Sequence, residues 1–243
     1  LHQQELIEQG VLLAHRLNHG LCLGAYRDLA LLLNLNRQVS RSLQSLVLCN
    51  DSTVPVLVPE VLVNQLDHWT HSYEQADQPV LAGMTDSAQR EAYHLQSYLL
   101  YSNKALLSNL AWLAFWQNFV PSGDKDQLID SGEIGLSQAL LNAGVRLEPA
   151  YPLIRLLMSE SGVAEELLRF RIDHPQHVNL TLFAWQALLD QGFPLIKKQI
   201  LFDQIETHGQ PIALSTLLSW LPPARVDLIR GDLQRLFVGR FSR

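Results

Sequence analysis

The sequence has few cysteines and no long apolar run, and each absence excludes a class of protein. Its 243 residues include only two cysteines, Cys22 and Cys49, too few for the disulfide framework of a small secreted domain. No apolar run reaches the roughly 18 residues of a membrane-spanning helix. The opening residues, LHQQELIEQG, lack the basic start and apolar segment of a signal peptide. We therefore expect a cytoplasmic protein with no transmembrane segment, either free or peripheral at the inner face of the membrane.

Basic residues are fewer than acidic residues: the chain has 18 Lys and Arg, 24 Asp and Glu, and a net charge of −6. General nucleic-acid binding needs a basic face to neutralise phosphates, so we expect no nucleic-acid partner. A single nucleotide is not excluded by this charge, because helix N-termini and backbone N–H groups can hold its phosphates.

Several catalytic signatures are missing as well. The chain contains no CxxC, no GxSxG and no P-loop. The pairs His68/His71 and His174/His177 have i,i+3 spacing but no third ligand at a matching distance, so neither predicts a metal site. A hydrolase of phosphorylated sugars would need a denser cluster of carboxylates or histidines than the sequence provides.

What is present is an alternation of strand and helix patterns up to about residue 151, which predicts an α/β sheet with helices on both faces. Ligands bind such sheets at the carboxyl ends of strands. From residue 152 on, the pattern predicts a helical C-terminal part packed on the sheet. The expected strands are 11–17, 43–49, 79–85 and 92–102; the expected helices are 2–9, 25–35, 59–71, 104–119, 133–142 (ended by Gly144), 161–170, 179–191, 195–204, 212–220 and 223–238.

The stretch RLNHGLCLGAYRD, residues 16–28, follows a predicted strand and opens a predicted helix. Gly20 and Gly24 would let the backbone turn tightly or approach a ligand closely. Arg16, Arg27 and the helix N-terminus would favour a phosphate there. A plain strand–loop–helix turn explains the same pattern, and the pattern alone favours that structural interpretation.

Two predicted strands end in similar polar segments, Asn-Asp-Ser at 50–52 and Thr-Asp-Ser at 85–87. A carboxylate at a strand end, such as Asp51, can bind a divalent cation that bridges a diphosphate, or accept a hydrogen bond from a sugar hydroxyl. The alternative is an Asx turn that only caps the strand. If the two strands are neighbours, Asp51 and Asp86 lie on one rim of the sheet.

Two further stretches provide polar side chains. In EAYHLQSYLLY, residues 91–101, a period of two places His94, Gln96 and Tyr98 on one face, which would line a polar pocket. A half-exposed strand is the structural alternative. Glu133 lies in the first turn of a predicted helix, where the helix dipole alone would also favour a carboxylate.

The order and spacing of these stretches resemble the rhamnan synthesis protein F family of bacterial glycosyltransferases, over residues of about 10 to 205. Each motif is weak alone, but six in order are fairly specific. The residues that match the family pattern are Arg16, Asn18, Gly20, Gly24, Ala25, Tyr26, Arg27; Asn50, Asp51, Ser52; Thr85, Asp86, Ser87; His94, Gln96, Ser97, Tyr98; Glu133, Gly135, Leu136, Ser137; and Trp185, Leu188, Leu189, Gly192, Phe193, Pro194, Lys197.

The resemblance implies a GT-A-like nucleotide-sugar domain over residues 1–151, with the helical part, 152–243, packed on it. It implies transfer of a sugar, with rhamnose expected, from a dTDP- or UDP-linked donor to a polysaccharide or lipid-linked acceptor of the bacterial cell envelope. Direct displacement with inversion needs a general base near the acceptor hydroxyl. Asp86 is the first choice for that base, Glu133 the second and His94 the third, with Gln96 and Tyr98 on the acceptor side.

On the donor side, the resemblance assigns Asp51, Asn50 and Ser52 to the diphosphate or ribose, directly or through Mn²⁺ or Mg²⁺ held by Asp51. Arg16 and Arg27 would offset the charge of the leaving group. The remaining members of the predicted donor site are Asn18, Gly20 and Gly24.

The chain departs from the family at several points. An Asp-Phe pair before the second glycine is replaced by Cys22-Leu23, and a Gly-Pro after the Asn-Asp-Ser segment by Val54-Pro55 or Val58-Pro59. The first strand or two of a GT-A domain have no counterpart before Leu1, so we expect the chain to begin inside a domain of a larger multidomain protein. These departures support an alternative function, a non-catalytic binding or scaffolding module derived from such an enzyme.

Overall fold

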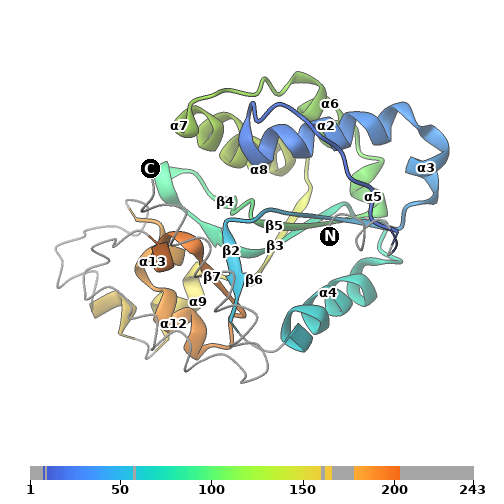
Figure 1. Cartoon of the computed structure of the whole chain (residues 1–243). Coiled ribbons are helices and arrows are strands. Elements are labelled where there is room, and N and C mark those ends of the chain that lie inside the picture. Colours follow the sequence, from blue (N-terminus) through green and yellow to red (C-terminus); the bar gives the residue numbers. More distant parts are fainter. Residues whose placement is uncertain (1–7, 9, 57–58, 160–161, 166–177, 203–243) are drawn as a thin grey trace.

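In the computed structural model, which describes residues 8, 10–56, 59–159, 162–165 and 178–202, an open mixed sheet separates two layers of helices (Figure 1). The strand order is β1-β5-β3-β4, and β6 pairs with β3. Only the β3–β6 pair is parallel among the pairs of this sheet in the described residues. The bounds are β1 (Ser45–Cys49), β3 (Val80–Ser87), β4 (His94–Leu95), β5 (Leu99–Asn103) and β6 (Arg146–Tyr151).

Strand β3 is central, since it pairs with β4, β5 and β6, and all eight of its residues are buried. Its sequence, VLAGMTDS, is apolar on both faces over its first five residues, as expected of a strand covered on both sides. Val80, Ala82 and Met84 point into one core cluster, whereas Leu81 points into the other.

Helices cover both faces of the sheet. On one face lie α4 (Pro59–Tyr73), α9 (Leu153–Met158), α11 (Leu180–Phe183) and α12 (Trp185–Asp190); on the other lie α2 (Leu21–Leu35), α5 (Lys104–Leu107), α6 (Leu110–Asn118), α7 (Lys125–Leu128), the π-helix η2 (Ile129–Ile134) and α8 (Gly135–Asn142) (Figure 1). The predicted α/β class with helices on both faces is therefore confirmed. The smaller elements are α3 (Arg37–Ser42), β2 (Thr53–Pro55), η1 (Gln89–Glu91), β7 (Leu195–Lys197) and α13 (Lys198–Phe202).

The predicted helices at 25–35, 59–71 and 133–142 are confirmed, and Gly144 ends α8 with a φ of +75°. The aromatic segment 104–119 is two helices rather than one, because the Asn109 side chain accepts the Ala111 N–H at 2.8 Å and starts a new helix. Trp112 and Trp116, which lie on the second of these helices, are buried in the core.

Other element predictions are wrong. Residues 11–17 form no strand: Leu12 and Leu17 are 97% and 87% exposed, and no described strand pairs with them. The predicted strand 92–102 is interrupted at 96–98, which separates β4 from β5. The segment predicted as a helix at 195–204 begins as strand β7, and β2 and β6 were not predicted. The predicted helices at 2–9, 161–170, 212–220 and 223–238 lie wholly or mostly outside the described residues.

The two segments that the sequence divides at residue 151 share one core. Phe193 packs edge-on against Tyr98 and Tyr151, with ring centroids 6.5 and 5.2 Å apart. Strand β7 pairs with β2 in a separate two-stranded antiparallel sheet. Within the part of the chain that the structure describes, every helix is too short or too polar to cross a membrane.

The turn before α2 explains its two glycines. Gly20 has a φ of +77°, and Leu21, also left-handed at +49°, follows it. Arg16 braces this turn through hydrogen bonds from Nη2 to His19 O (2.7 Å) and from Nη1 to Leu21 O (3.3 Å). Gly24 lies directly under the turn, so a side chain there would overlap the carbonyl oxygen of His19.

Replacing Gly24 by alanine is therefore expected to lower the free energy of unfolding by about 1–3 kcal/mol, the usual cost of overpacking. The added methyl would overlap His19 O and lie 2.7 Å from Arg16 Nη2. Chemical denaturation would measure the loss. Gly123→Ala is the matched control, since nothing lies within 4 Å of a Cβ at that position; equal losses in the two variants would contradict the prediction.

Candidate functional site

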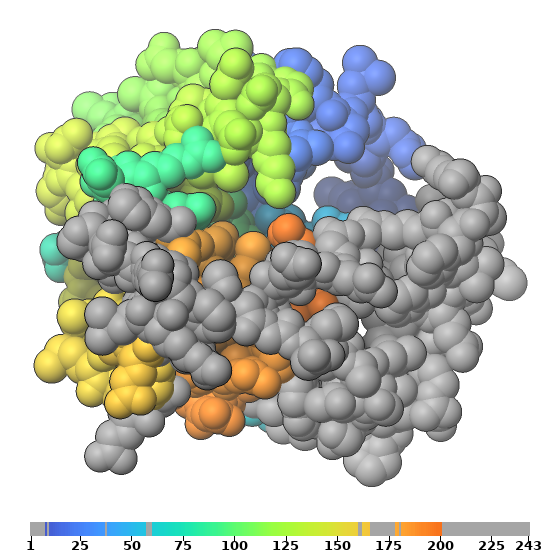
Figure 2. Space-filling view, turned by 90° about the vertical axis from the view of Figure 1, so that its left-hand side faces the viewer, coloured from blue at the N-terminus to red at the C-terminus, as the bar shows by residue number. Residues whose placement is uncertain are grey.

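A cleft of about 1000 Å³ opens beyond the carboxyl end of β1. Figure 2 shows the face on which the molecule is hollowed between the blue segment that contains α2, the light-green helical segment and the orange segment 195–202. The size matches ordinary ligand sites, which reach about 1,000 Å³. The described lining of the cleft comes from the start of α2, the turn 50–52, residues 89–90 and 96–98, the segment 125–133, and residues 179, 182 and 197–199.

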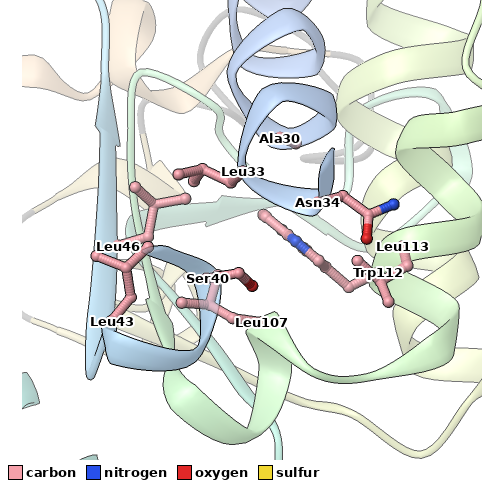
Figure 3. Close-up of a pocket in the computed structure, with 9 residues that line it drawn as sticks. All are labelled: Ala30, Leu33, Asn34, Ser40, Leu43, Leu46, Leu107, Trp112 and Leu113. Atoms are coloured by element: carbon pink, nitrogen blue, oxygen red, sulfur yellow. The ribbon is translucent and has the colours of Figure 1, made fainter. Parts of the chain in front are cut away.

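A second cavity lies between α2 and α6 and is lined mainly by leucines and Trp112 (Figure 3). Its volume is only about 10 Å³, which is room for one water at most. It is therefore a gap in the core packing, and the large cleft is the candidate site.

The turn 50–52 is an Asx turn that caps the strand, and its residues also line the cleft. Asn50 Oδ1 accepts the Ser52 N–H at 2.9 Å, which is the predicted Asx turn. Asp51 points away from this turn: its side chain is 97% exposed, lines the cleft and lies 3.3 Å from Lys198 Nζ. The Ser52 hydroxyl is buried and has no hydrogen-bond partner among the described residues. The turn thus caps the strand and still leaves two side chains for a ligand.

Lysines on β7 and α13 lie beside this turn. The Lys198 N–H donates to Ser52 O at 2.8 Å, and Lys197 pairs in register with Thr53. Lys197 is partly buried, with Nζ 4.4 Å from the centre of the Tyr98 ring, an attractive cation–π geometry. Burial lowers the pKa of the Lys197 ammonium below its usual value, although the nearby Glu133 carboxylate raises it in part.

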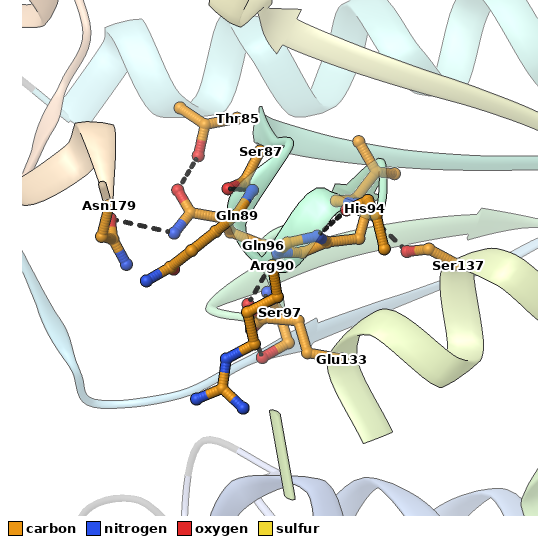
Figure 4. A network of polar contacts seen from close by, with 12 residues as sticks. Thr85, Ser87, Gln89, Arg90, His94, Gln96, Ser97, Glu133, Ser137 and Asn179 are labelled. Carbon is orange, nitrogen blue, oxygen red and sulfur yellow. Dashed lines mark hydrogen bonds and ion pairs between the residues drawn. The ribbon is translucent and has the colours of Figure 1, made fainter. Parts of the chain in front are cut away.

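Glu133 is brought into the cleft by the π-helix η2, in which an extra residue widens one turn. Its Oε2 accepts the Ser97 N–H at 2.8 Å and the Ser97 hydroxyl at 2.5 Å (Figure 4). Burial raises the pKa of the Glu133 carboxyl, but the neighbouring His94 and the hydrogen bonds from Ser97 outweigh burial and hold the pKa below its usual range. Glu133 is therefore an ionised carboxylate at neutral pH.

His94 lies behind Glu133 and is almost completely buried. Its Nδ1 is 2.7 Å from Ala92 O, and because a carbonyl only accepts, Nδ1 carries a hydrogen. Its Nε2 faces Glu133 Oε1 at 3.5 Å. His94 is not among the described residues that line the cleft, so it is placed to orient Glu133 rather than to touch a ligand.

A chain of hydrogen bonds links Gln96 and Tyr98, the two residues that the sequence analysis predicts on the acceptor side. The Tyr98 hydroxyl donates to Thr85 Oγ1 at 2.6 Å, because the Thr85 hydroxyl is itself engaged with Gln96 Oε1 at 2.8 Å. Gln96 Nε2 then donates to Asn179 Oδ1 at 3.3 Å (Figure 4). The break between β4 and β5 places Gln96, Ser97 and Tyr98 together in the cleft lining, instead of alternating them across a strand.

Asp86, the first choice for a base, is placed elsewhere. It is 8% exposed, and its Oδ1 accepts the Leu153 N–H at the start of α9, at 2.5 Å. Burial raises the pKa of the Asp86 carboxyl, although the hydrogen bond from Leu153 lowers it in part. Asp86 is not among the described residues that line the cleft; its contacts are those of a helix cap.

Replacing Asp86 by asparagine is expected to leave the free energy of unfolding within about 1 kcal/mol, since the amide oxygen still accepts the Leu153 N–H. Asp86→Ala leaves that N–H unpaired and should cost about 1–3 kcal/mol. Because burial raises the folded-state pKa, the stability of the wild type relative to Asp86→Asn should fall as pH rises through that pKa. Urea denaturation at pH 4 to 8 measures both effects, and equal losses in the two variants would contradict the assignment.

The predicted donor residues before and within α2 are only partly brought together. Gly20 lines the cleft, as do Leu21, Cys22 and Leu23. The other predicted residues are engaged elsewhere or exposed: Arg16 Nε bonds Asp28 at 2.8 Å, Arg27 lies 3.7 Å from the same carboxylate, Asn18 is exposed, and Gly24 packs under the turn. None of these four is among the described residues that line the cleft.

Arg90 is a cleft residue that sequence reasoning missed. It makes ion pairs of 2.6 Å with both Asp126 and Asp130. Arg90 and Glu91 have φ values of +62° and +60°, a left-handed conformation that costs a non-glycine residue about 1–3 kcal/mol. The two ion pairs hold this strained connection against α7 and the π-helix that carries Glu133. Lys197 and Lys198 were also missed as site residues, although Lys197 belongs to the last segment of the family resemblance.

The structure is that of an α/β protein with an open mixed sheet and a polar, lysine-containing cleft at a strand end. No protein-family model matches the chain, and no solved structure matches it. Virulence protein VirA of Vibrio anguillarum is 29% identical over 133 residues. The match covers 50% of this chain and 43% of that protein, so the chain spans less than half the length of the curated relatives. None of these findings bears on the rhamnan synthesis family, whose resemblance stays a prediction.

Proposed function

We propose that this chain is the GT-A-like module of a glycosyltransferase that moves a sugar from a nucleotide diphosphate donor to a bacterial surface polysaccharide. One observation carries the proposal: a single cleft brings together the turn 50–52, the lysines at 197 and 198, and the Glu133 carboxylate. Glycosyl transfer needs these three kinds of group, namely hydrogen-bonding partners for the donor, positive charge for the leaving diphosphate, and a base for the acceptor.

In this reaction Glu133 takes the proton of the acceptor hydroxyl while that oxygen attacks the anomeric carbon of the donor sugar. The bond from the anomeric carbon to the diphosphate oxygen breaks, and the diphosphate leaves with the electron pair. We assign the base to Glu133 in preference to Asp86, because Glu133 lines the cleft and a base must reach the proton that it removes. His94 holds Glu133 from behind, and Gln96 and Tyr98 lie on the acceptor side.

Calorimetry with UDP and dTDP, followed by donor consumption with the matching sugar nucleotides, tests the proposal. We expect saturable binding of one nucleotide and slow release of that nucleoside diphosphate from its rhamnose or hexose conjugate. Asp51→Ala should weaken binding, whereas Asp77→Ala, an exposed carboxylate that is not among the described cleft residues, should not. Failure of the wild type to bind either nucleotide would contradict the proposal.

The alternative, a non-catalytic binding module, is favoured by Cys22. This residue lines the cleft at the position where the family pattern has an aspartate. If the donor site is only weakened, Cys22→Asp should raise nucleotide affinity. An unchanged affinity, together with no donor consumption by the wild type, would favour the binding module.

A further inference from the structure

The described residues that line the cleft include four with cationic side chains, Arg90, Lys125, Lys197 and Lys198, and these differ in whether a carboxylate neutralises them. Arg90 is paired with two carboxylates, and Lys198 lies 3.3 Å from Asp51. Lys125 and Lys197 have no carboxylate within ion-pairing distance among the described residues, although both line the cleft. Among the described residues of the cleft, the positive charge without a carboxylate partner is therefore that of two lysines, Lys125 and Lys197. Such a charge favours an anionic ligand.

Lys197 is held in place by the fold. Its backbone is fixed by the pairing of β7 with β2, and its ammonium lies over the Tyr98 ring. Holding a charge in this partly buried place is costly, as the lowered pKa of Lys197 reflects. An anion bound at Nζ would offset that cost. The Ser52 hydroxyl has no hydrogen-bond partner among the described residues. The carbonyl of Ser52 accepts the N–H of Lys198, the residue that follows Lys197. Ser52 and Lys197 both line the cleft.

The carboxylates of the cleft are poorly arranged for a divalent cation, which takes several oxygen ligands. Asp51 lies beside Lys198, Asp126 pairs with Arg90, and Glu133 accepts both hydrogen bonds of Ser97. No group of three His, Cys, Asp or Glu side chains within the described residues is arranged to hold a metal ion. A cation that bridged the diphosphate would have Asp51 as its single carboxylate ligand among the described residues. The ammonium of Lys198 lies beside that carboxylate.

We propose that Lys197 and Lys198, with the Ser52 hydroxyl, bind the diphosphate of the donor directly, without a bridging divalent cation. This inference rests on the proposed function for the identity of the donor, but the diphosphate site itself does not depend on transfer activity. The lysines would also stabilise the charge that develops on the leaving group, the part played by metal ions or arginines in other sites.

The pH dependence of binding follows from the environment of Lys197. Its charge is influenced by Glu133, Cys22 and Lys125, and it lies over Tyr98. A bound diphosphate raises the lowered pKa again, so Lys197 takes up a proton on binding at a pH between the free and bound values. Affinity should therefore fall as pH rises through that window. Calorimetry in buffers of different ionisation enthalpy measures the uptake, which Lys197→Met should remove.

The deciding experiment is calorimetric titration of the wild-type protein with inorganic pyrophosphate, UDP and UMP, in EDTA and again with Mg²⁺ or Mn²⁺. In EDTA we expect saturable binding of pyrophosphate and UDP and much weaker binding of UMP. Lys197→Met, which keeps the bulk of the side chain over Tyr98, should lower both affinities by about 10- to 100-fold, the usual effect of losing a charge-assisted contact. Lys104→Met removes an exposed lysine that is not among the described cleft residues and should change neither affinity.

The possible outcomes separate the two proposals. Binding that requires the metal ion, is lost in Asp51→Ala and survives in Lys197→Met would overturn the lysine site and leave the glycosyltransferase proposal standing. Pyrophosphate binding in EDTA that depends on Lys197, without binding of UDP or dTDP, would support the lysine site and contradict the proposed donor. No binding of pyrophosphate would overturn the lysine site. Circular dichroism checks the fold of each variant, and Lys198→Ala repeats the test if Lys197→Met does not fold.

Discussion

Replacing Glu133 by glutamine is expected to lower sugar transfer by about 10²- to 10⁴-fold, the contribution usual for a general base. The substitution removes the basic oxygen but keeps an acceptor for the Ser97 N–H and hydroxyl, which lie 2.8 and 2.5 Å from the carboxylate. Affinity for the nucleoside diphosphate should stay within about two-fold, because Glu133 is not assigned to the donor. Donor consumption with an acceptor, measured beside nucleotide calorimetry, gives both quantities.

The control for this prediction is Asp86→Asn, a second carboxylate-to-amide change that also preserves a hydrogen-bond acceptor. It should keep at least half of the wild-type transfer rate, because Asp86 caps α9 instead of lining the cleft. Loss of transfer in Asp86→Asn with activity retained in Glu133→Gln would reverse the assignment and restore Asp86 as the base.

Replacing Asn103 by alanine is expected to lower the free energy of unfolding by about 3–5 kcal/mol, at the upper end of single-residue effects. This fully buried amide makes five hydrogen bonds. Its oxygen accepts the N–H groups of Val80 and Leu106, each at 3.0 Å. Its two N–H groups face the carbonyls of Tyr73, the last residue of α4, and of Ala76 and Gln78 in the connection to β3. The truncation leaves several backbone groups without a partner, and each costs about 1–3 kcal/mol when buried.

Thermal and urea unfolding would measure this loss. Asn109→Ala is the matched control: Asn109 is also an asparagine at a helix start, but its side chain makes one capping bond, to Ala111 N–H. That variant should lose about 1 kcal/mol. Equal losses in the two variants would mean that the additional hydrogen bonds of Asn103 contribute nothing measurable.

The fold could be predicted from the sequence where periodicity or composition is strong. The run VLAGMT could only be a buried strand or a buried helix segment, and its short length favours the strand. Strand β6 was missed because its sequence, RLEPAY, has a proline and little alternation, and because its parallel pairing with β3 depends on residues more than 60 positions away. The apolar run at 11–17 satisfies the same composition rule as a strand but finds no described edge to pair with.

The sequence predicted two parts of the candidate site. One is the polar segment 50–52, which directly follows a strand, and the other is Glu133, a carboxylate in the first turn of a predicted helix. The sequence could not distinguish Asp51 from Asp86, because both follow a predicted strand in the same way. In the structure Asp86 lies inside β3, paired with β4, and accepts the Leu153 N–H at the start of α9. Nor could the sequence reveal Lys197 as a cleft residue, since that depends on the pairing of β7 with β2. Spacing predicts neighbours along a strand or helix, but it does not predict which distant segments meet.

The pairing of β2 with β7 also affects how the protein is made. Asp51 and Lys198, which lie side by side at the turn, are 147 residues apart in the chain. At typical synthesis rates of about 5–20 residues per second, Lys198 is translated on the order of ten seconds after Asp51. During this time β1, β3 and β5 can already pair, while the turn 50–52 has no lysine beside it. Ligand binding is therefore expected to begin late in synthesis, after the sheet has formed.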